Sequence, residues 1–216
     1  MRLASLCLNL LLLLTLPIDS ALAQDTPSIK AFAPYTRCTL SDGLSVVETA
    51  PLAFGVTSRT VTTMKGPYNV ALAAGRRVMF AYPEEDFYAN VKVEILPAEG
   101  YADSKDALIS DFEHTLSIDD NSRNYALKPR LNQFDIQGLD RSKREGGVLG
   151  VYLLFDDPTR TVITIYFLNQ EPPKRFHNMQ EYAAIRDRFL NEYTSCIRKA
   201  LIANQESAPT QPPSHP

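Results

Sequence analysis

Residues 148–155 read VLGVYLLF and residues 162–168 read VITIYFL, and both stretches are almost wholly apolar. The link between them, residues 156–160, reads DDPTR and consists of polar and turn-forming residues. This order predicts two strands joined as an antiparallel hairpin. Because neither strand has a polar face, each strand must be covered on both of its faces. We therefore expect the two strands at the centre of a sheet, with one layer above it and one below.

A first amphipathic helix is predicted over residues 103–117. Leu108, Phe112 and Leu116 recur at intervals of four residues, which places them on one stripe of a helix. Asp103 is a candidate N-cap. This helix is expected to cover one face of the sheet.

A second, longer helix is predicted from Asn178 to about Ala203. Asn178, followed three residues later by Glu181, resembles a capping box. The apolar residues that follow share one face of the helix: Ile185, Phe189, Tyr193, Cys196 and Ala200. We expect this face to pack on the sheet and to bring Cys196 to the core.

The remaining strands are shorter. They are predicted at residues 44–49, 76–82, 91–95, 125–130 and 134–141. Strands, helix, strands and helix in this order, with hairpin connections, indicate an α+β fold. We expect a central antiparallel sheet covered by helices on both faces, an α/β/α sandwich, in a single domain over residues 36–204.

Both ends of the chain are expected to lie outside this domain. Residues 1–23 read as a cleavable secretory signal, with an apolar run at 10–16 and the small-residue site Ala21-Leu22-Ala23. The alternative is an uncleaved membrane anchor, although the run is short for a span. Residues 24–35 are expected to form a flexible lead-in, and the proline-rich residues 205–216 a disordered tail. The protein is thus expected to be secreted or periplasmic, with no stable membrane insertion after signal cleavage.

Charge and cysteine content narrow the function classes. The net charge of −3 argues against nucleic-acid binding, which usually needs a basic excess. Removal of the signal takes away Cys7 and leaves Cys38 and Cys196. A pair of cysteines in an exported protein favours a disulfide between them, and two buried free thiols are the alternative.

No catalytic motif stands out. Of the three histidines, His215 lies in the tail, and neither His114 nor His177 has a partner of the kind that a triad or a metal site requires. The acidic pairs are flanked by turn residues and are expected to be solvated. We therefore predict neither a cofactor nor a metal site.

The most basic patch of the sequence is a candidate ligand site. Asp140, Arg141 and Lys143 follow one another closely, and Arg130 lies on the preceding predicted strand. On paired strands these residues could converge on an anionic ligand, with Arg141 as a bidentate contact. The alternative is a solvated strand end.

The layout resembles the PsbP-like superfamily, which also includes the Ran-binding Mog protein. The matching features are the strand end Phe80-Ala81-Tyr82-Pro83, the helix after Tyr101, the strand end Gly138-Leu139-Asp140-Arg141, the apolar hairpin and the capped terminal helix. The resemblance implies a central antiparallel sheet with helices on both faces. It also implies a binding or assembly subunit without chemistry of its own.

These observations favour an exported, non-catalytic binding or assembly module. Its expected partner is an unknown protein or small molecule in the envelope or the extracellular space. One alternative is a hydrolase-type enzyme with a site assembled from scattered residues around Asp140, Arg141 and His177. The other is a carrier of a small apolar ligand, which would need a cavity between the sheet and a helix.

Overall fold

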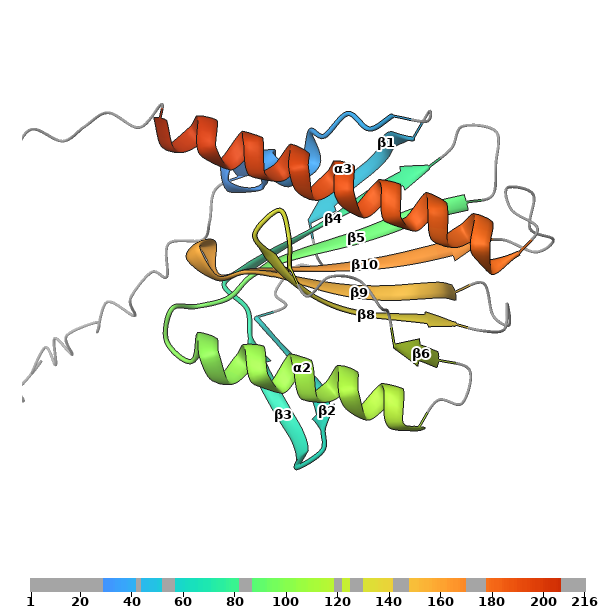
Figure 1. Ribbon diagram of the computed structural model, residues 1–216. Helices are drawn as coiled ribbons and strands as arrows, with labels where there is room; N and C mark the ends of the chain where they lie inside the picture. The colour runs from blue at the N-terminus through green and yellow to red at the C-terminus, as the bar shows by residue number, and fades with distance from the viewer. Residues whose placement is uncertain are drawn as a thin grey trace, which may run out of the picture.

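The computed structural model describes residues 29–41, 44–51, 57–81, 87–118, 122–124, 130–141, 148–169 and 178–206. The expected signal at 1–23, and the expected tail beyond Glu206, lie outside the described residues. The described chain is an α+β protein with two antiparallel sheets (Figure 1). Among the described residues, no helix is both long enough and apolar enough to cross a membrane.

The larger sheet is antiparallel throughout. Its strands run in the order β1 (Ser45–Pro51), β4 (Ala74–Ala81), β5 (Phe87–Ile95), β10 (Thr161–Asn169), β9 (Val148–Asp156), β8 (Phe134–Arg141) and β6 (Ser122–Asn124). The short strand β7 (Arg130–Leu131) also pairs with β8. Of the strand expected at 125–130, only Arg130 is described.

The predicted central hairpin is confirmed. β9 and β10 are antiparallel neighbours, in register from the pair Thr161 and Asp156 to the pair Phe167 and Gly150, and other strands flank them on both sides. The short 3-10 helix η3 (Asp157–Thr159) makes the connection, and Arg160 closes it in the left-handed conformation with φ 54°. The apolar stretches therefore occupy the middle of the sheet, as their lack of a polar face requires.

One face of the sheet is covered by α3 (Met179–Glu206), drawn in red in Figure 1. Phe189 packs edge-on against Phe167 of β10, with ring centroids 5.2 Å apart, and against Phe80 of β4 at 5.5 Å. Asn178 is confirmed as the N-cap, because its Oδ1 accepts the backbone N–H groups of residues 180 and 181 at 2.9 and 3.0 Å. The terminal helix thus begins where the capping pattern predicted.

On the opposite side of the sheet lie α2 (Tyr101–Ile118) and the hairpin of β2 (Ser58–Thr63) and β3 (Gly66–Ala71), which forms the second sheet (Figure 1). The hairpin was not predicted. Leu108 and Phe112 are buried as expected. Asp103 is not the N-cap, because the helix begins two residues earlier, after Gly100 with φ 71°, and Asp103 lies in its first turn.

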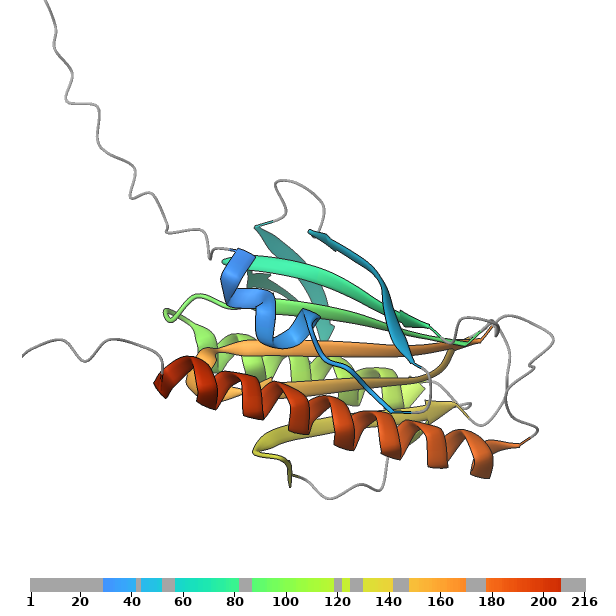
Figure 2. The same ribbon diagram turned by 90° about the horizontal axis from the view of Figure 1, so that it is seen from above.

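The entering segment differs from the flexible lead-in expected at 24–35. From Ile29 it forms the 3-10 helix η1 (Ile29–Phe32) and the short helix α1 (Ala33–Thr36), which packs beside α3 (Figure 2). Tyr35 is buried there, and its backbone carbonyl accepts the Tyr193 hydroxyl at 2.8 Å. The predicted disulfide between Cys38 and Cys196 is confirmed, with Cα atoms 5.8 Å apart. It ties the start of the described chain to the last helix.

Candidate functional site

A pocket of about 200 Å³ lies between α2, β2 and the strands β8, β9 and β10. It forms because α2 packs mainly on the β2–β3 hairpin and less closely on the larger sheet. Its apolar lining comes from Leu108, Phe112, Leu139, Val151 and Leu153. Its polar lining comes from Arg59, Asp111, Thr115, Thr164 and Tyr166.

Two polar atoms at this pocket are buried without a hydrogen-bond partner among the described residues. They are Oγ1 of Thr164 and Nε of Arg59. Thr164 lies in the middle of β10 and is 3% exposed. A buried hydroxyl or N–H without a partner costs about 1–3 kcal/mol, and such groups are rare in folded proteins. Both residues line the same pocket, so its wall contains two residues with incomplete hydrogen bonding.

Arg59 is held in place by an ion cluster around the buried Glu94. Its Nη2 lies 3.1 Å from Glu94 Oε2, and Lys92 Nζ lies 3.4 Å from Glu94 Oε1. Glu94 is 1% exposed, and these two cations compensate its burial. Burial lowers the pKa of Lys92, and Glu94 partly opposes that shift. The glutamate uses one edge of the Arg59 guanidinium and leaves Nε for another acceptor.

The remaining polar groups of the pocket have defined roles. Burial raises the pKa of Tyr166, so its hydroxyl stays protonated at neutral pH. Asp111 on α2 accepts the backbone N–H of Thr62 at 2.8 Å and thereby joins the helix to the hairpin. Neither histidine nor cysteine is among the described lining residues. An apolar hollow with two donors is suited to binding a small molecule.

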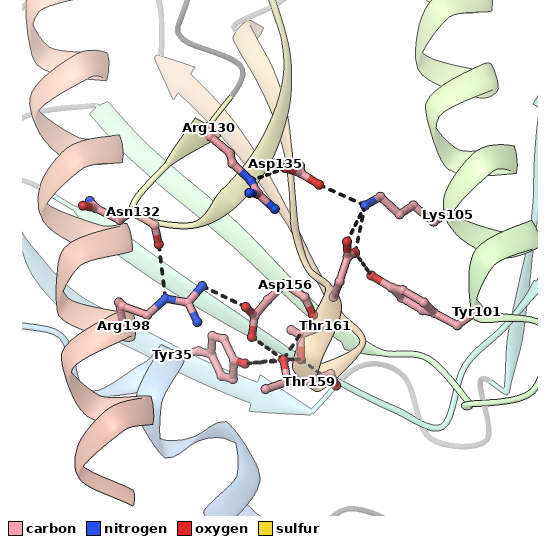
Figure 3. Close-up of polar contacts among 11 residues, drawn as sticks. Tyr35, Tyr101, Lys105, Arg130, Asn132, Asp135, Asp156, Thr159, Thr161 and Arg198 are labelled. Atoms are coloured by element: carbon pink, nitrogen blue, oxygen red, sulfur yellow. Dashed lines mark hydrogen bonds and ion pairs between the residues drawn. The ribbon is translucent and has the colours of Figure 1, made fainter. Parts of the chain in front are cut away.

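A second concentration of polar groups lies at the hairpin end of β9 and β10 (Figure 3). Asp156 is fully buried and accepts Arg198 Nη2 of α3 at 2.8 Å and the Thr159 hydroxyl at 2.5 Å. The Tyr35 hydroxyl donates to Thr161 at 3.2 Å. These contacts hold α1, α3 and the hairpin together.

The same end of the hairpin is bonded to α2. Lys105 Nζ lies 3.1 Å from Asp135 Oδ2 and 2.8 Å from Asp157 Oδ1, and the Tyr101 hydroxyl donates to Asp157 at 2.7 Å (Figure 3). Burial alone would raise the pKa of Asp157, but Lys105 and Tyr101 bring it below its ordinary value. A hollow of about 200 Å³ opens here, and the charged groups lining it are ion-paired. We interpret this network as structural, because it joins α2 to β8 and to the end of the β9–β10 hairpin.

A third cluster joins β8, β9 and α3. Asp140 accepts hydrogen bonds from Tyr152 and from Arg186, and the hydroxyls of Tyr152 and Tyr182 lie 2.7 Å apart. Gly150 is required beside them, because a Cβ at this position would come within 3.0 Å of both hydroxyls. Burial raises the pKa of Tyr152 well above its ordinary value. The cluster fastens the first turns of α3 to the sheet.

The structure does not bring the predicted ligand residues Arg130 and Asp140 together. Arg130 is largely exposed and pairs with Asp135 at one end of β8, while Asp140 lies at the other end, about 17 Å away along the strand. The two aspartates also face opposite sides of the sheet, toward α2 and α3 respectively. The side chain of Arg141 and all of Lys143 lie outside the described residues, so their predicted role stays untested.

The histidine predictions are tested only in part. His114 is half-buried on α2, and His177 lies outside the described residues. The pocket residues Arg59, Asp111, Thr164 and Tyr166 were not singled out from the sequence. One signal was present: Thr164 and Tyr166 are the polar residues within the apolar stretch 162–168, and their spacing of two places them on one face of the strand.

The fold and this pocket define an α+β protein with a ligand-sized hollow under one helix. No family model, no curated protein and no solved structure matches the chain.

Proposed function

We propose that this protein is an exported, non-catalytic binding module that holds a small, mainly apolar ligand between α2 and the larger sheet. The observation that carries the proposal is a pocket whose wall contains two residues with an unpartnered, buried polar atom, Thr164 Oγ1 and Arg59 Nε. A ligand with an acceptor group would complete their hydrogen bonding when the side chains that cover these atoms move aside to admit it.

The walls of the pocket support this role. Leu108, Phe112, Leu139 and Leu153 are buried residues of the core cluster that joins α2 to the sheet. They offer an apolar surface to a ligand, and the polar groups fix its orientation, which is the usual division of labour in small-molecule sites. The arrangement favours the carrier hypothesis within the broader class of binding modules.

Localisation and family are parts of the same proposal. The Cys38–Cys196 disulfide supports an oxidising compartment, and thus a secreted or periplasmic protein. The position of α2 and α3 on opposite sides of the antiparallel sheet supports a sandwich of the PsbP-like kind (Figure 1). This relationship is proposed from the pattern of strands and helices alone, since no family model and no solved structure matches the chain.

The experiment is an NMR titration of the purified protein with 1-hexanol, hexanamide and hexanoate, followed through the methyl signals of valine, leucine and isoleucine. We expect the methyl signals of Val151, Leu153 and Leu108 to shift with ligand concentration. The methyl signals of Ile163 and Ile165, which face α3, serve as the internal control because they lie on the other side of the sheet.

A filling variant provides the matched test. Val151→Phe adds an aromatic ring to the pocket wall and should abolish the shifts, whereas Ile202→Phe, on the exposed side of α3, should leave them unchanged. Circular dichroism checks that both variants keep their fold. Titrations in which none of the three compounds moves the pocket methyl signals would refute the proposed function.

A further inference from the structure

We infer that the disulfide between Cys38 and Cys196 is an exchange site for a small anionic thiol, which attacks Sγ of Cys196 and becomes bonded to it. The inference is independent of the proposed function, because it concerns α3 and a different hollow. Three observations carry it: the unequal burial of the two cysteines, the hollow beside one of them, and the contacts that hold the chain in place when the bond opens.

The two halves of the disulfide differ in exposure. Cys38 is 5% exposed and belongs to the core cluster, whereas Cys196 is half-buried. A thiolate breaks a disulfide by attacking one of its two sulfurs, and access helps to decide which one. The side chain of cysteine ends at Sγ, so a half-buried cysteine on a helix exposes atoms at its sulfur or one bond away from it. Attack from solvent is therefore directed at Cys196.

A wide, open hollow of about 730 Å³ lies beside Cys196. The described residues that line it are Arg37 and Thr39 of the entering segment and Asn191, Glu192, Ser195, Cys196, Lys199 and Ala200 of α3. Cys38 is not among these described residues. Hollows of about 300–1,000 Å³ hold small organic ligands, so a cysteinyl peptide of the size of glutathione has room beside Cys196.

The charge around this hollow favours an anionic thiol. Arg37 and Lys199 are both exposed, and neither is ion-paired with another described residue. The carboxylate of Glu192, also in the lining, already accepts the backbone N–H of Ser41 at 2.7 Å and the hydroxyl of the same residue. Two cations and one carboxylate leave the lining with a net charge of +1. This charge raises the local concentration of an anion at low ionic strength.

The exchange is balanced without a further oxidant or reductant. The thiolate forms a bond to Sγ of Cys196, the bond between the two cysteine sulfurs breaks, and the Cys38 sulfur leaves and takes up a proton. The products are a mixed disulfide at Cys196 and a free thiol at Cys38. The Cys38 thiol attacks the mixed disulfide in turn, which expels the small thiol and restores the original bond.

The chain around Cys38 stays packed when the bond opens. Tyr35 and Leu40, on either side of it in sequence, are buried, and the Tyr193 hydroxyl donates to the Tyr35 carbonyl at 2.8 Å. Because these contacts do not involve the disulfide, Cys38 remains beside Cys196 and the reverse attack is intramolecular. The small thiol is therefore a reversible cap whose attachment needs no unfolding.

The experiment exposes the purified, oxidised protein to excess glutathione under native conditions and stops the reaction with acid. Free thiols are then labelled with N-ethylmaleimide in denaturant, and peptide mapping by mass spectrometry locates both groups. We expect glutathione on Cys196 and the maleimide label on Cys38. Removal of the glutathione should restore the original disulfide without an added oxidant.

Two measurements separate attack on the folded protein from attack on unfolded chains. Exchange through the hollow should keep its rate when urea is added at low concentration, whereas global unfolding becomes faster with urea. Thr39→Trp places an indole at the hollow and should slow the exchange severalfold. Thr60→Trp, also at an exposed threonine but on β2, is the matched control and should leave the rate unchanged. Circular dichroism checks that both variants are folded.

The class of thiol is tested by charge. Lys199→Glu should slow exchange with glutathione about two- to threefold at low salt, and added salt should remove the difference. Exchange with the neutral 2-mercaptoethanol should not change. Lys65→Glu, at the exposed tip of the β2–β3 hairpin, alters the net charge of the protein equally but away from the hollow, and should have no effect on either rate.

Each outcome decides a separate part of the inference. Glutathione found on Cys38, on neither cysteine, or attached at a rate that rises with urea as unfolding does, would overturn the exchange site. Equal effects of Lys199→Glu and Lys65→Glu would overturn the choice of an anionic thiol. None of these results bears on the pocket under α2, and a failed titration of that pocket leaves the reaction of Cys196 standing.

Discussion

Replacing Thr164 by valine should make the protein more stable, although it removes a polar group from the middle of a strand. Thr164 is 3% exposed, and its hydroxyl has no partner among the described residues. Such an unpaired hydroxyl costs about 1–3 kcal/mol, and the methyl group that replaces it adds about 0.8 kcal/mol of apolar burial. Water that enters the half-open pocket offsets part of the cost of the unpaired hydroxyl. We therefore expect a gain of about 1 kcal/mol, or a rise in Tm of about 2–4 °C for a chain of this size.

The matched control is Thr161→Val on the same strand. Thr161 is also buried, but its hydroxyl accepts the Tyr35 hydroxyl at 3.2 Å and lies 2.9 Å from that of Thr159. Here the substitution leaves a buried partner unsatisfied and should cost about 1–2 kcal/mol. The same change from threonine to valine, made at two buried positions of one strand, should thus change the free energy of unfolding in opposite directions.

The assay is urea unfolding of both variants with the disulfide intact, followed by circular dichroism, with the slope m checked for constancy. If Thr164→Val lowers stability as much as Thr161→Val does, the Thr164 hydroxyl has a partner in the folded protein. The pocket wall would then contain no unpaired Thr164 hydroxyl for a ligand to satisfy.

Three further perturbations test other parts of the fold. Replacing Cys38 and Cys196 by serine should lower the free energy of unfolding by up to about 5 kcal/mol in the chain-entropy model for a separation of 158 residues, and an unchanged urea midpoint would show that the disulfide adds nothing. Because the pKa of Asp157 is lowered in the folded state, its contribution to stability should be present above about pH 4 and lost as the pH falls further. Lys105→Met should flatten that dependence in acid titrations, whereas an unaltered profile would contradict the assigned pairing. Gly150→Ala should cost about 1–3 kcal/mol in urea unfolding, because its Cβ collides with two tyrosine hydroxyls; a neutral result would mean that the hydroxyls move aside freely.

The centre of the fold was predictable because its signal is local. The stretches 148–155 and 162–168 each show, within eight residues, that both faces are buried, and a buried strand needs neighbours on both sides. The capping pattern at Asn178 is equally local, and the structure confirms it. The disulfide followed from the number of cysteines and the expected compartment.

The β2–β3 hairpin was missed because its pattern is weak. Val61 and Val70 are its fully buried apolar residues, and most of the other side chains are exposed or half-buried. Gly66, with φ 116°, marks the turn, but a single glycine is a common feature of loops. Contacts with α2 hold the hairpin in position. These contacts join residues that are distant in sequence, so a local pattern cannot reveal them.

The pocket was missed for a related reason. Arg59 and its partner Glu94 are 35 residues apart, and Thr164 is 70 residues beyond Glu94. The three residues come together only when the hairpin, β5 and β10 have assembled. By contrast, the predicted patch around Asp140 relied on closeness in sequence, and the strand carries Arg130 and Asp140 to opposite ends.

The bond between Cys38 and Cys196 also constrains how the protein can be made. The first of these cysteines emerges 158 residues before the second, which at ordinary synthesis rates is a wait of roughly 10–30 s. During that interval its thiol is open to wrong partners, and α1 has no helix to pack against. The covalent closure of this molecule is therefore a late event, and agents that cap thiols should trap nascent chains far more readily than finished ones.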